Sequence, residues 1–175
     1  MVKFTQILGK KNMILANKIL KKEIKELNLI TKKIFLSKNE NFLKLCENSL
    51  NSLKSGGKIL LFGNGGSAAD AQHIAAEFIG RFNYNRTSLP AIALTSNSSI
   101  ITSISNDYSY DVVFSRQCES LVKKGDVVIG ITTSGNSLNV KKGLLVSKKL
   151  SATTIGFLGK KGSIKKIVDI SLSVN

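Results

Sequence analysis

Five short apolar runs, separated by longer stretches of helical spacing, constrain the fold of this chain more than any other feature. Each run is apolar almost throughout, which is typical of a strand buried on both faces of a parallel sheet. Strands that alternate with helices predict βαβ units with right-handed crossovers. The sequence therefore predicts an α/β fold, an αβα sandwich around a doubly wound parallel sheet. The predicted strands are 58–62, 91–95, 127–131, 153–158 and 167–174.

Amphipathic helices are predicted on both sides of these strands. Residues 13–36 and 41–53 place apolar side chains at helical spacing opposite Lys and Glu, and Ser55-Gly56-Gly57 ends the second stretch. We expect a single domain over 1–175, made of an N-terminal helical segment, 1–55, and a sandwich core, 56–175. Between the strands, helices are predicted at 67–82, 98–105, 111–123 and 137–149.

The net charge of +15 raises the question of a nucleic-acid or membrane partner. The charge is +9 over residues 1–58 and +8 over 121–175, but −2 over 59–120, which contains the glycine-rich loop at 63–67. Most of the basic residues are lysines, which are typical of a solvated surface. We therefore do not expect a nucleic-acid partner. No apolar run is long enough for a membrane span, no signal peptide is evident, and two cysteines indicate no disulfide framework, so a cytoplasmic location is expected.

A glycine-rich loop, Gly63-Asn64-Gly65-Gly66-Ser67, follows the first predicted strand. In open α/β sheets, ligands bind beyond the carboxyl ends of the strands. Glycines allow close backbone approach, and the next helix offers free N–H groups, so an anion or a polyol is the natural ligand. The loop also fits a loose dinucleotide fingerprint, but Thr95-Ser96-Asn97 stands where that pattern needs an acid. A plain tight turn remains the alternative.

A second loop, Thr132-Thr133-Ser134-Gly135-Asn136-Ser137, follows the third predicted strand. Its four hydroxyl groups stand just before a helix, an arrangement suited to a phosphate monoester. The alternative is a helix N-cap, for which Ser137 alone would be enough. Together the two loops indicate a phosphorylated small molecule.

His73 and Glu77 lie four residues apart on the predicted helix after the glycine loop, so they share one face. Catalysis or metal binding is one interpretation, and a helix-surface contact is the other. Arg81 follows one turn later, either as a surface residue or as a charge for substrate phosphate or hydroxyl groups.

These residues resemble the phosphoheptose isomerases, the sedoheptulose 7-phosphate isomerases of the sugar isomerase (SIS) domain family. The resemblance covers residues 40–162 in register and is highly specific. It implies a doubly wound, flavodoxin-like SIS fold. The matching segments are 63–73, Glu77, Gly80-Arg81, Leu89–Thr95, Asn106-Asp107-Tyr108, Phe114–Gln117, Gly125-Asp126-Val127 and Gly130–Ser137.

The resemblance implies conversion of sedoheptulose 7-phosphate to D-glycero-D-manno-heptose 7-phosphate, for lipopolysaccharide or capsule. It implies that Glu77 is the catalytic base and that zinc is bound by His73 and Glu77. It also implies a homotetramer with sites near subunit interfaces, where Arg81 could contribute. The implied contacts to sugar and phosphate come from Asn64, Gly65, Gly66, Ser96, Asn97, Thr132, Thr133, Ser134 and Ser137.

The sequence departs from the family at two points. Asn97 stands where the family usually has Asp, so that contact loses its charge. Family members also continue into a C-terminal helix with an Arg-Ile-Gln-Glu-x-His type of motif and a later His, which supply two zinc ligands and the acid. The sequence ends at Asn175, before that helix, so we expect an incomplete zinc-ligand set and an impaired activity.

Two alternatives to an isomerase remain open at this point. The first is a non-catalytic SIS-domain protein that binds a sugar phosphate or associates with a replication initiator. The retained His73 and Glu77 argue against it, because such relatives need no such pair. The second is nucleic-acid binding through the Lys-rich flanks, which salt-sensitive binding would reveal.

Overall fold

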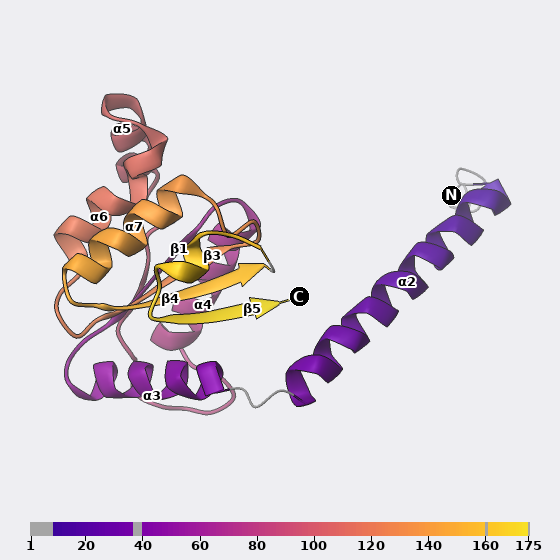
Figure 1. The fold of residues 1–175 in the computed structure, drawn as a ribbon, viewed down its shortest axis with the longest axis horizontal. Helices are drawn as coiled ribbons and strands as arrows, with labels where there is room; N and C mark the ends of the chain where they lie inside the picture. Colours follow the sequence, from indigo (N-terminus) through magenta and orange to yellow (C-terminus); the bar gives the residue numbers. More distant parts are fainter. Residues whose placement is uncertain (1–8, 37–39, 160, 175) are drawn as a thin grey trace. The chain divides into compact units, whose positions relative to one another are not determined.

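The computed structural model describes residues 9–36, 40–159 and 161–174 (Figure 1). Its chain divides into two compact units, one holding helix α2, Gly9–Leu36, and the other beginning at Glu40. In the second unit, strands alternate with helices as predicted, and the α/β fold class is confirmed. The strands are β1, Ile59–Gly63; β2, Ala91–Ala93; β3, Val127–Thr132; β4, Thr153–Gly159; and β5, Ile170–Val174.

The helices of the second unit differ from the predicted ranges mainly at their ends. The predicted helix over 111–123 is a short 3-10 turn, η1, followed by an α-helix, because Ser109 caps η1 through the Asp111 N–H. A second 3-10 turn, η2, precedes the last predicted strand, and residues 167–169 form a turn and bend, so this strand begins at Ile170. The bounds are α3, Glu40–Lys54; α4, Gly66–Ile79; α5, Ser98–Asp107; η1, Tyr110–Val112; α6, Val113–Leu121; α7, Leu138–Lys149; and η2, Ile164–Lys166.

The five strands form one parallel sheet in the order β2-β1-β3-β4-β5. The chain leaves β1 toward β2 and then crosses back to β3 on the other side of β1. Strand order therefore reverses between β1 and β3, and the loops after these two strands diverge there. In open α/β sheets such a switch point is where ligands bind.

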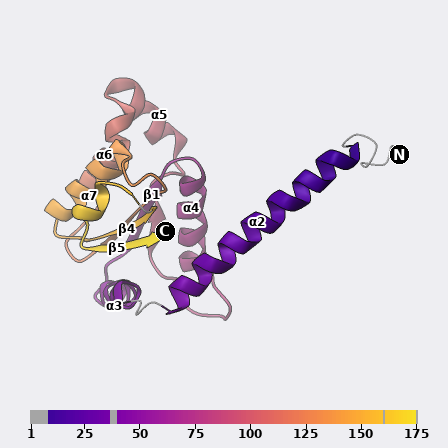
Figure 2. The ribbon, with the colours of Figure 1, turned by 45° about the vertical axis from the view of Figure 1, so that its right-hand side comes forward.

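Alternate residues of the strands point into two separate apolar cores. Leu60 and Phe62 of β1 belong to the core under α6 and α7, whereas Ile59 and Leu61 belong to the core under α3 and α4. Figure 2 shows these helix pairs on opposite faces of the sheet. All four side chains are fully buried, as expected for a strand covered on both faces. The N-terminal helix α3 also covers β5, and Asn41 Nδ2 donates to Ser171 O at 2.9 Å.

Helix α2 forms the other unit and runs for 28 residues. Most of its apolar side chains whose burial is described are exposed, among them Ile19, Ile24 and Leu27. None of the described helices is both long enough and apolar enough to cross a membrane.

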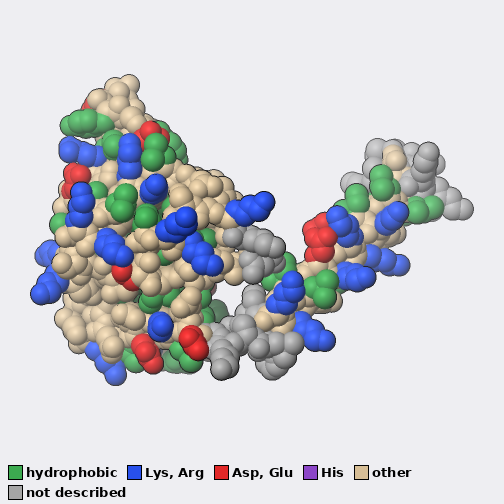
Figure 3. All heavy atoms as spheres, in the orientation of Figure 1, with side chains coloured by type: hydrophobic (Ala, Val, Ile, Leu, Met, Phe, Trp, Pro, Cys, Tyr) green, Lys and Arg blue, Asp and Glu red, His purple; other side chains and the backbone are tan. Residues whose placement is uncertain are grey.

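On the face of the sheet-containing unit that Figure 3 shows, Lys and Arg side chains are scattered among polar and apolar ones.

Asp169 gives the fold a pH-dependent contact beside the edge strand β5. Burial raises the pKa of this carboxyl, but hydrogen bonds from Lys148 and Thr154 outweigh it and hold the pKa below its ordinary value of 3.8. Lys148 Nζ lies 2.7 Å from Asp169 Oδ1, and the Thr154 N–H and hydroxyl donate to Oδ2 at 2.9 and 2.7 Å.

We expect these contacts to stabilise the fold above the unfolded pKa of Asp169 and to lose their effect as the pH falls through its lower folded pKa. Urea unfolding of the unchanged protein and of Asp169→Asn, from about pH 7 to about pH 2.5, measures this dependence. The difference in the free energy of unfolding should be largest near neutrality and shrink in acid. A difference independent of pH would contradict the assignment.

Candidate functional site

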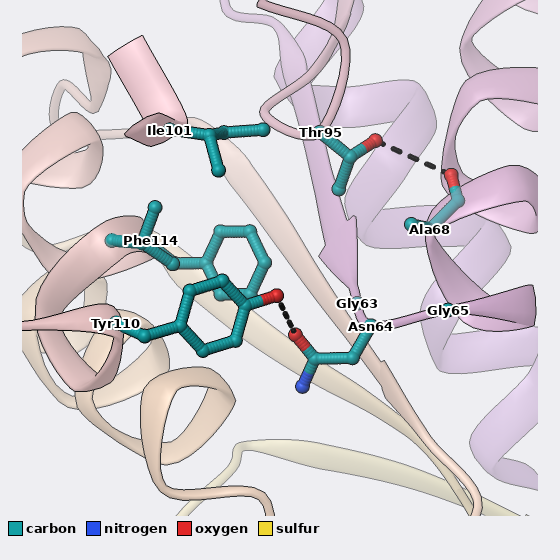
Figure 4. Close-up of a pocket in the computed structure, with 9 residues that line it drawn as sticks. Gly63, Asn64, Gly65, Ala68, Thr95, Ile101, Tyr110 and Phe114 are labelled. Atoms are coloured by element: carbon teal, nitrogen blue, oxygen red, sulfur yellow. Dashed lines mark hydrogen bonds between the residues drawn. The ribbon is translucent and has the colours of Figure 1, made fainter. Parts of the chain in front are cut away.

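A cavity of about 200 Å³ opens at the carboxyl edge of the sheet, at the switch point beside β1 (Figure 4). The glycine loop forms its floor, and the turn after β2 and the segment from η1 to α6 form its walls. The lining is Gly63, Asn64, Gly65, Ala68, Thr95, Ile101, Tyr110, Val113 and Phe114. The cavity thus combines an apolar wall with the polar groups of a strand-end loop.

The glycine loop is shaped by positions where a side chain does not fit. A Cβ on Gly63 would lie 2.7 Å from Ile131 O and 2.7 Å from Ser67 Cβ, so the end of β1 can pack against β3 and α4 only as glycine. Gly65 has φ +55°, in the left-handed region, and precedes α4 without any side-chain cap. The N–H groups of Ser67 and Ala68 donate within the loop, to Asn64 O and Gly65 O, both at 3.0 Å. The positive end of the α4 dipole lies at this loop, beside the cavity-lining Gly65 and Ala68.

The second loop gathers three of its hydroxyl groups. Thr132 Oγ1 lies 2.9 Å from Ser137 Oγ and 3.3 Å from Ser134 Oγ. Ser137 stands at the N-cap position of α7 yet makes no side-chain cap hydrogen bond, so its hydroxyl serves the cluster and not the helix end. Gly135, between Ser134 and Ser137, has φ +66°, in the left-handed region that favours glycine. Thr133 is exposed, and no side-chain hydrogen bond joins it to this hydroxyl cluster.

Asn64 connects the glycine loop to the start of α7. Its amide exchanges two hydrogen bonds of 2.9 Å with the amide of Asn139, and it accepts a third, of 3.0 Å, from the Tyr110 hydroxyl. The sequence reasoning missed Asn139 and Tyr110. The available signal was a polar residue, Asn139, set between apolar ones in the first turn of a helix.

Ser96 and Asn97 lie in the turn after β2, next to Thr95 of the cavity wall. Both side chains bond to nearby backbone. The Ser96 hydroxyl donates to Ala93 O at 3.1 Å, and Asn97 Oδ1 accepts from the Ile100 N–H at 3.1 Å as the N-cap of α5. A sugar contact from Asn97 would therefore come from its amide N–H₂ group.

His73, Glu77 and Arg81 lie away from the hydroxyl cluster. The imidazole Nε2 of His73 is 3.3 Å from Glu77 Oε1 on the outer face of α4, and the His73 side chain is 75% exposed. Helix α4 runs back from the carboxyl edge, and Glu77 is roughly 16 Å beyond Gly66 along its axis. Arg81, past the helix end, is exposed and donates to Asn85 Oδ1 at 3.3 Å.

Arg86 anchors the end of α4 that carries Glu77. Its guanidinium donates to the carbonyl oxygens of Glu77, at 2.6 Å, and of Phe78, at 2.8 Å. These are among the carbonyls that a helix C-terminus leaves unpaired. Sequence reasoning gave Arg86 no role, because the contact depends on how the chain returns toward β2.

The donor set for a metal ion is small. Among the residues that the structure describes, no group of three or more His, Cys, Asp or Glu side chains could hold a metal ion. His73 and Glu77 supply two donors, whereas protein zinc sites use at least three. The described residues of one chain therefore do not form a zinc site by themselves.

Known proteins resemble this chain in sequence and in structure. The SIS domain family model matches residues 24–159. The phosphoheptose isomerase of Geobacter sulfurreducens is 56% identical over 124 residues, which are 70% of this chain and 66% of that protein. The structure of a phosphoheptose isomerase from Francisella tularensis superposes with a TM-score of 0.87 at 27% identity, covering 91% of this chain and 86% of that one. The enzyme from Neisseria gonorrhoeae gives 0.84 at 36% identity, covering 90% and 85%.

Proposed function

Because the chain belongs to the phosphoheptose isomerases of the SIS domain family, we propose that it converts sedoheptulose 7-phosphate to D-glycero-D-manno-heptose 7-phosphate. The observation that best supports this proposal is the placement of the glycine loop and the hydroxyl cluster at one switch point of the sheet. A phosphate monoester fits the hydroxyl groups of Thr132, Ser134 and Ser137, and a polyol fits the glycine loop beside them.

In the proposed reaction, Glu77 moves a proton between two neighbouring carbon atoms. Its carboxylate removes a proton from C1 of the ketose, and the C1–C2 bond becomes the double bond of an enediol. The proton returns to C2 as the hydroxyl proton of O1 moves to O2, so the product is an aldose and no atom is gained or lost. We propose that Asn64, Gly65 and Gly66 contact the sugar, that Ser96 and Asn97 contact its hydroxyl groups, and that Thr133 contacts the phosphate.

We further propose that a second copy of the chain supplies Glu77, within a homotetramer. Glu77 and the hydroxyl cluster lie toward opposite edges of the sheet in one chain, so a single sugar phosphate held at the cluster does not reach its own Glu77. His73 and Glu77 are on the outer face of α4, where a neighbouring subunit can approach them. Arg81, exposed beyond the same helix, is placed to contribute to such a shared site.

Hybrid oligomers test the shared site. We expect Glu77→Gln and the double variant Ser134→Ala/Ser137→Ala to be inactive alone. Co-expressed with different tags and purified as hybrids, they should regain activity, because about a quarter of the sites in a random mixture then combine an unchanged loop with an unchanged Glu77. Hybrids no more active than either variant would contradict the proposal, since a site within one chain is never intact in them.

His73 and Glu77 are the residues of this chain at the proposed zinc site. We propose that these two side chains are the donors that this chain offers, and that further donors come from outside the described residues of one chain. The product is a phosphorylated heptose, which we place in heptose synthesis for lipopolysaccharide or capsule, in the cytoplasm.

The direct test incubates the purified protein with sedoheptulose 7-phosphate in deuterated water and follows the products by NMR. The proposal expects an aldose heptose phosphate that carries solvent deuterium at C2, because a carboxylate exchanges its proton with water between the two transfers. Binding of the substrate without conversion, both by this chain and by the chain extended with the family's C-terminal helix, would refute the isomerase and favour the non-catalytic SIS-domain alternative.

A further inference from the structure

A buried asparagine that no proposed step uses lies directly behind the glycine loop. Asn139 is 4% exposed, at the second residue of α7, and its amide faces that of Asn64 across the gap between the two loops. A buried amide is costly unless its hydrogen bonds are made. Here each amide donates to the other at 2.9 Å, which joins the loop after β1 to the helix after β3.

The hydrogen bonds determine which way both amides point. The backbone N–H of Val140 can only donate, and it lies 2.9 Å from Asn139 Oδ1. The oxygen of Asn139 is therefore fixed on that side, and its Nδ2 faces Asn64 Oδ1. Asn64 in turn places its own Nδ2 against Asn139 Oδ1. The paired geometry leaves no freedom for either amide to flip.

Tyr110 completes the arrangement from the other side of the cavity. Figure 4 shows its ring beside Phe114, with its hydroxyl directed at Asn64 Oδ1, and the two oxygens are 3.0 Å apart. Asn64 Oδ1 then accepts from both Asn139 and Tyr110, so both of its lone pairs are engaged. One Nδ2 hydrogen of Asn64 serves Asn139, and within the described chain no hydrogen bond uses the other.

We propose that Asn139 and Tyr110 are positioning residues that hold Asn64 as a hydrogen-bond donor to an oxygen atom of the bound sugar. The inference rests on the proposed isomerase function. With its oxygen engaged twice, Asn64 offers the ligand only an N–H group. A fixed donor suits a carbonyl oxygen that gains negative charge as the enediol forms, because the donor needs no reorientation at that moment.

A double-mutant cycle tests the positioning role. In the unchanged background, Tyr110→Phe should lower kcat/KM about fivefold, the effect of one hydrogen bond, and Asn139→Ala should lower it roughly tenfold or more. With Asn64→Ala already present, each should add less than about twofold, because the group on which they act is gone. Equal losses in both backgrounds, or no loss from Tyr110→Phe in the unchanged protein, would overturn the proposal.

Matched controls separate positioning from folding. Tyr108→Phe changes a neighbouring exposed tyrosine whose hydroxyl is near Arg116, 3.4 Å away, and should leave kcat/KM unchanged in both backgrounds. Thermal midpoints are measured for every variant, and Asn64→Ser provides a second background if Asn64→Ala folds poorly. If Tyr110 and Asn139 contribute only to folding, their substitution should lower the thermal midpoint. It should then lower kcat/KM by the same factor whether or not the Asn64 amide is present.

A second measurement separates this inference from the proposed reaction. The same cycle is repeated for the dissociation constant of sedoheptulose 7-phosphate, measured by calorimetry. If the unchanged protein binds this compound but does not convert it, the reaction is refuted for this chain as it stands, and coupled losses of affinity still support the positioning role. Additive losses of affinity would overturn it, and so would an unchanged protein that neither binds nor converts the compound.

Discussion

Glu77→Gln is expected to lower kcat for heptose phosphate isomerisation by about 10²- to 10⁴-fold, the range that a positioned general base contributes. The amide has the shape of the carboxylate but cannot take a proton from carbon. KM should change little, because the proposed phosphate contacts come from the hydroxyl cluster and not from α4. Initial rates with sedoheptulose 7-phosphate, together with deuterium uptake at C2, measure the loss.

The fold should tolerate this substitution. The Glu77 carboxylate is 38% exposed, and its 3.3 Å contact with His73 is of the helix-surface kind that contributes little to stability. Glu119→Gln is the matched control, since Glu119 is an exposed glutamate in a comparable helix pair, 3.5 Å from Arg116, away from the cavity. Glu77→Gln retaining more than about a tenth of the activity would show that another group is the base.

The strands and the two ligand loops could be predicted because their signals are local. An apolar run followed by glycines, or by clustered hydroxyl groups, identifies a buried strand and its functional end within a few residues. Even the excess hydroxyl groups were informative, because Ser137 stands at the N-cap position and yet bonds to Thr132. The ends of the strands are predicted less exactly. The sequence predicts a strand up to Thr95, but β2 ends at Ala93, after which the chain turns toward Asn97 and the start of α5.

The contacts that organise the site are long-range, and no local pattern contains them. Asn139 is 75 residues from Asn64, and Tyr110 is 46 residues from it. Their meeting depends on the order β1-β3 within the sheet and on where η1 is placed. The spacing of His73 and Glu77 correctly predicted a shared helix face, but only the direction of α4 reveals how far Glu77 lies from the hydroxyl cluster.

Asp126 forms the most deeply buried ion pair in the described part of the chain, just before β3. Its carboxylate is 2% exposed and lies 2.7 Å from Lys58 Nζ. It also accepts from the backbone N–H of Lys58, at 3.0 Å, and of Lys123, at 2.7 Å. One side chain therefore joins the start of β1, the start of β3 and the turn after α6.

Asp126→Ala is expected to lower the free energy of unfolding by about 3–5 kcal/mol, because it leaves the Lys58 ammonium and two backbone N–H groups without their acceptor. Urea unfolding measures the loss, with Asp107→Ala as the control at an exposed aspartate. The double variant Asp126→Ala/Lys58→Met should be more stable than Asp126→Ala alone, since it removes the uncompensated charge as well. A double variant no more stable than Asp126→Ala would show that the two backbone N–H groups, and not the ion pair, account for the loss.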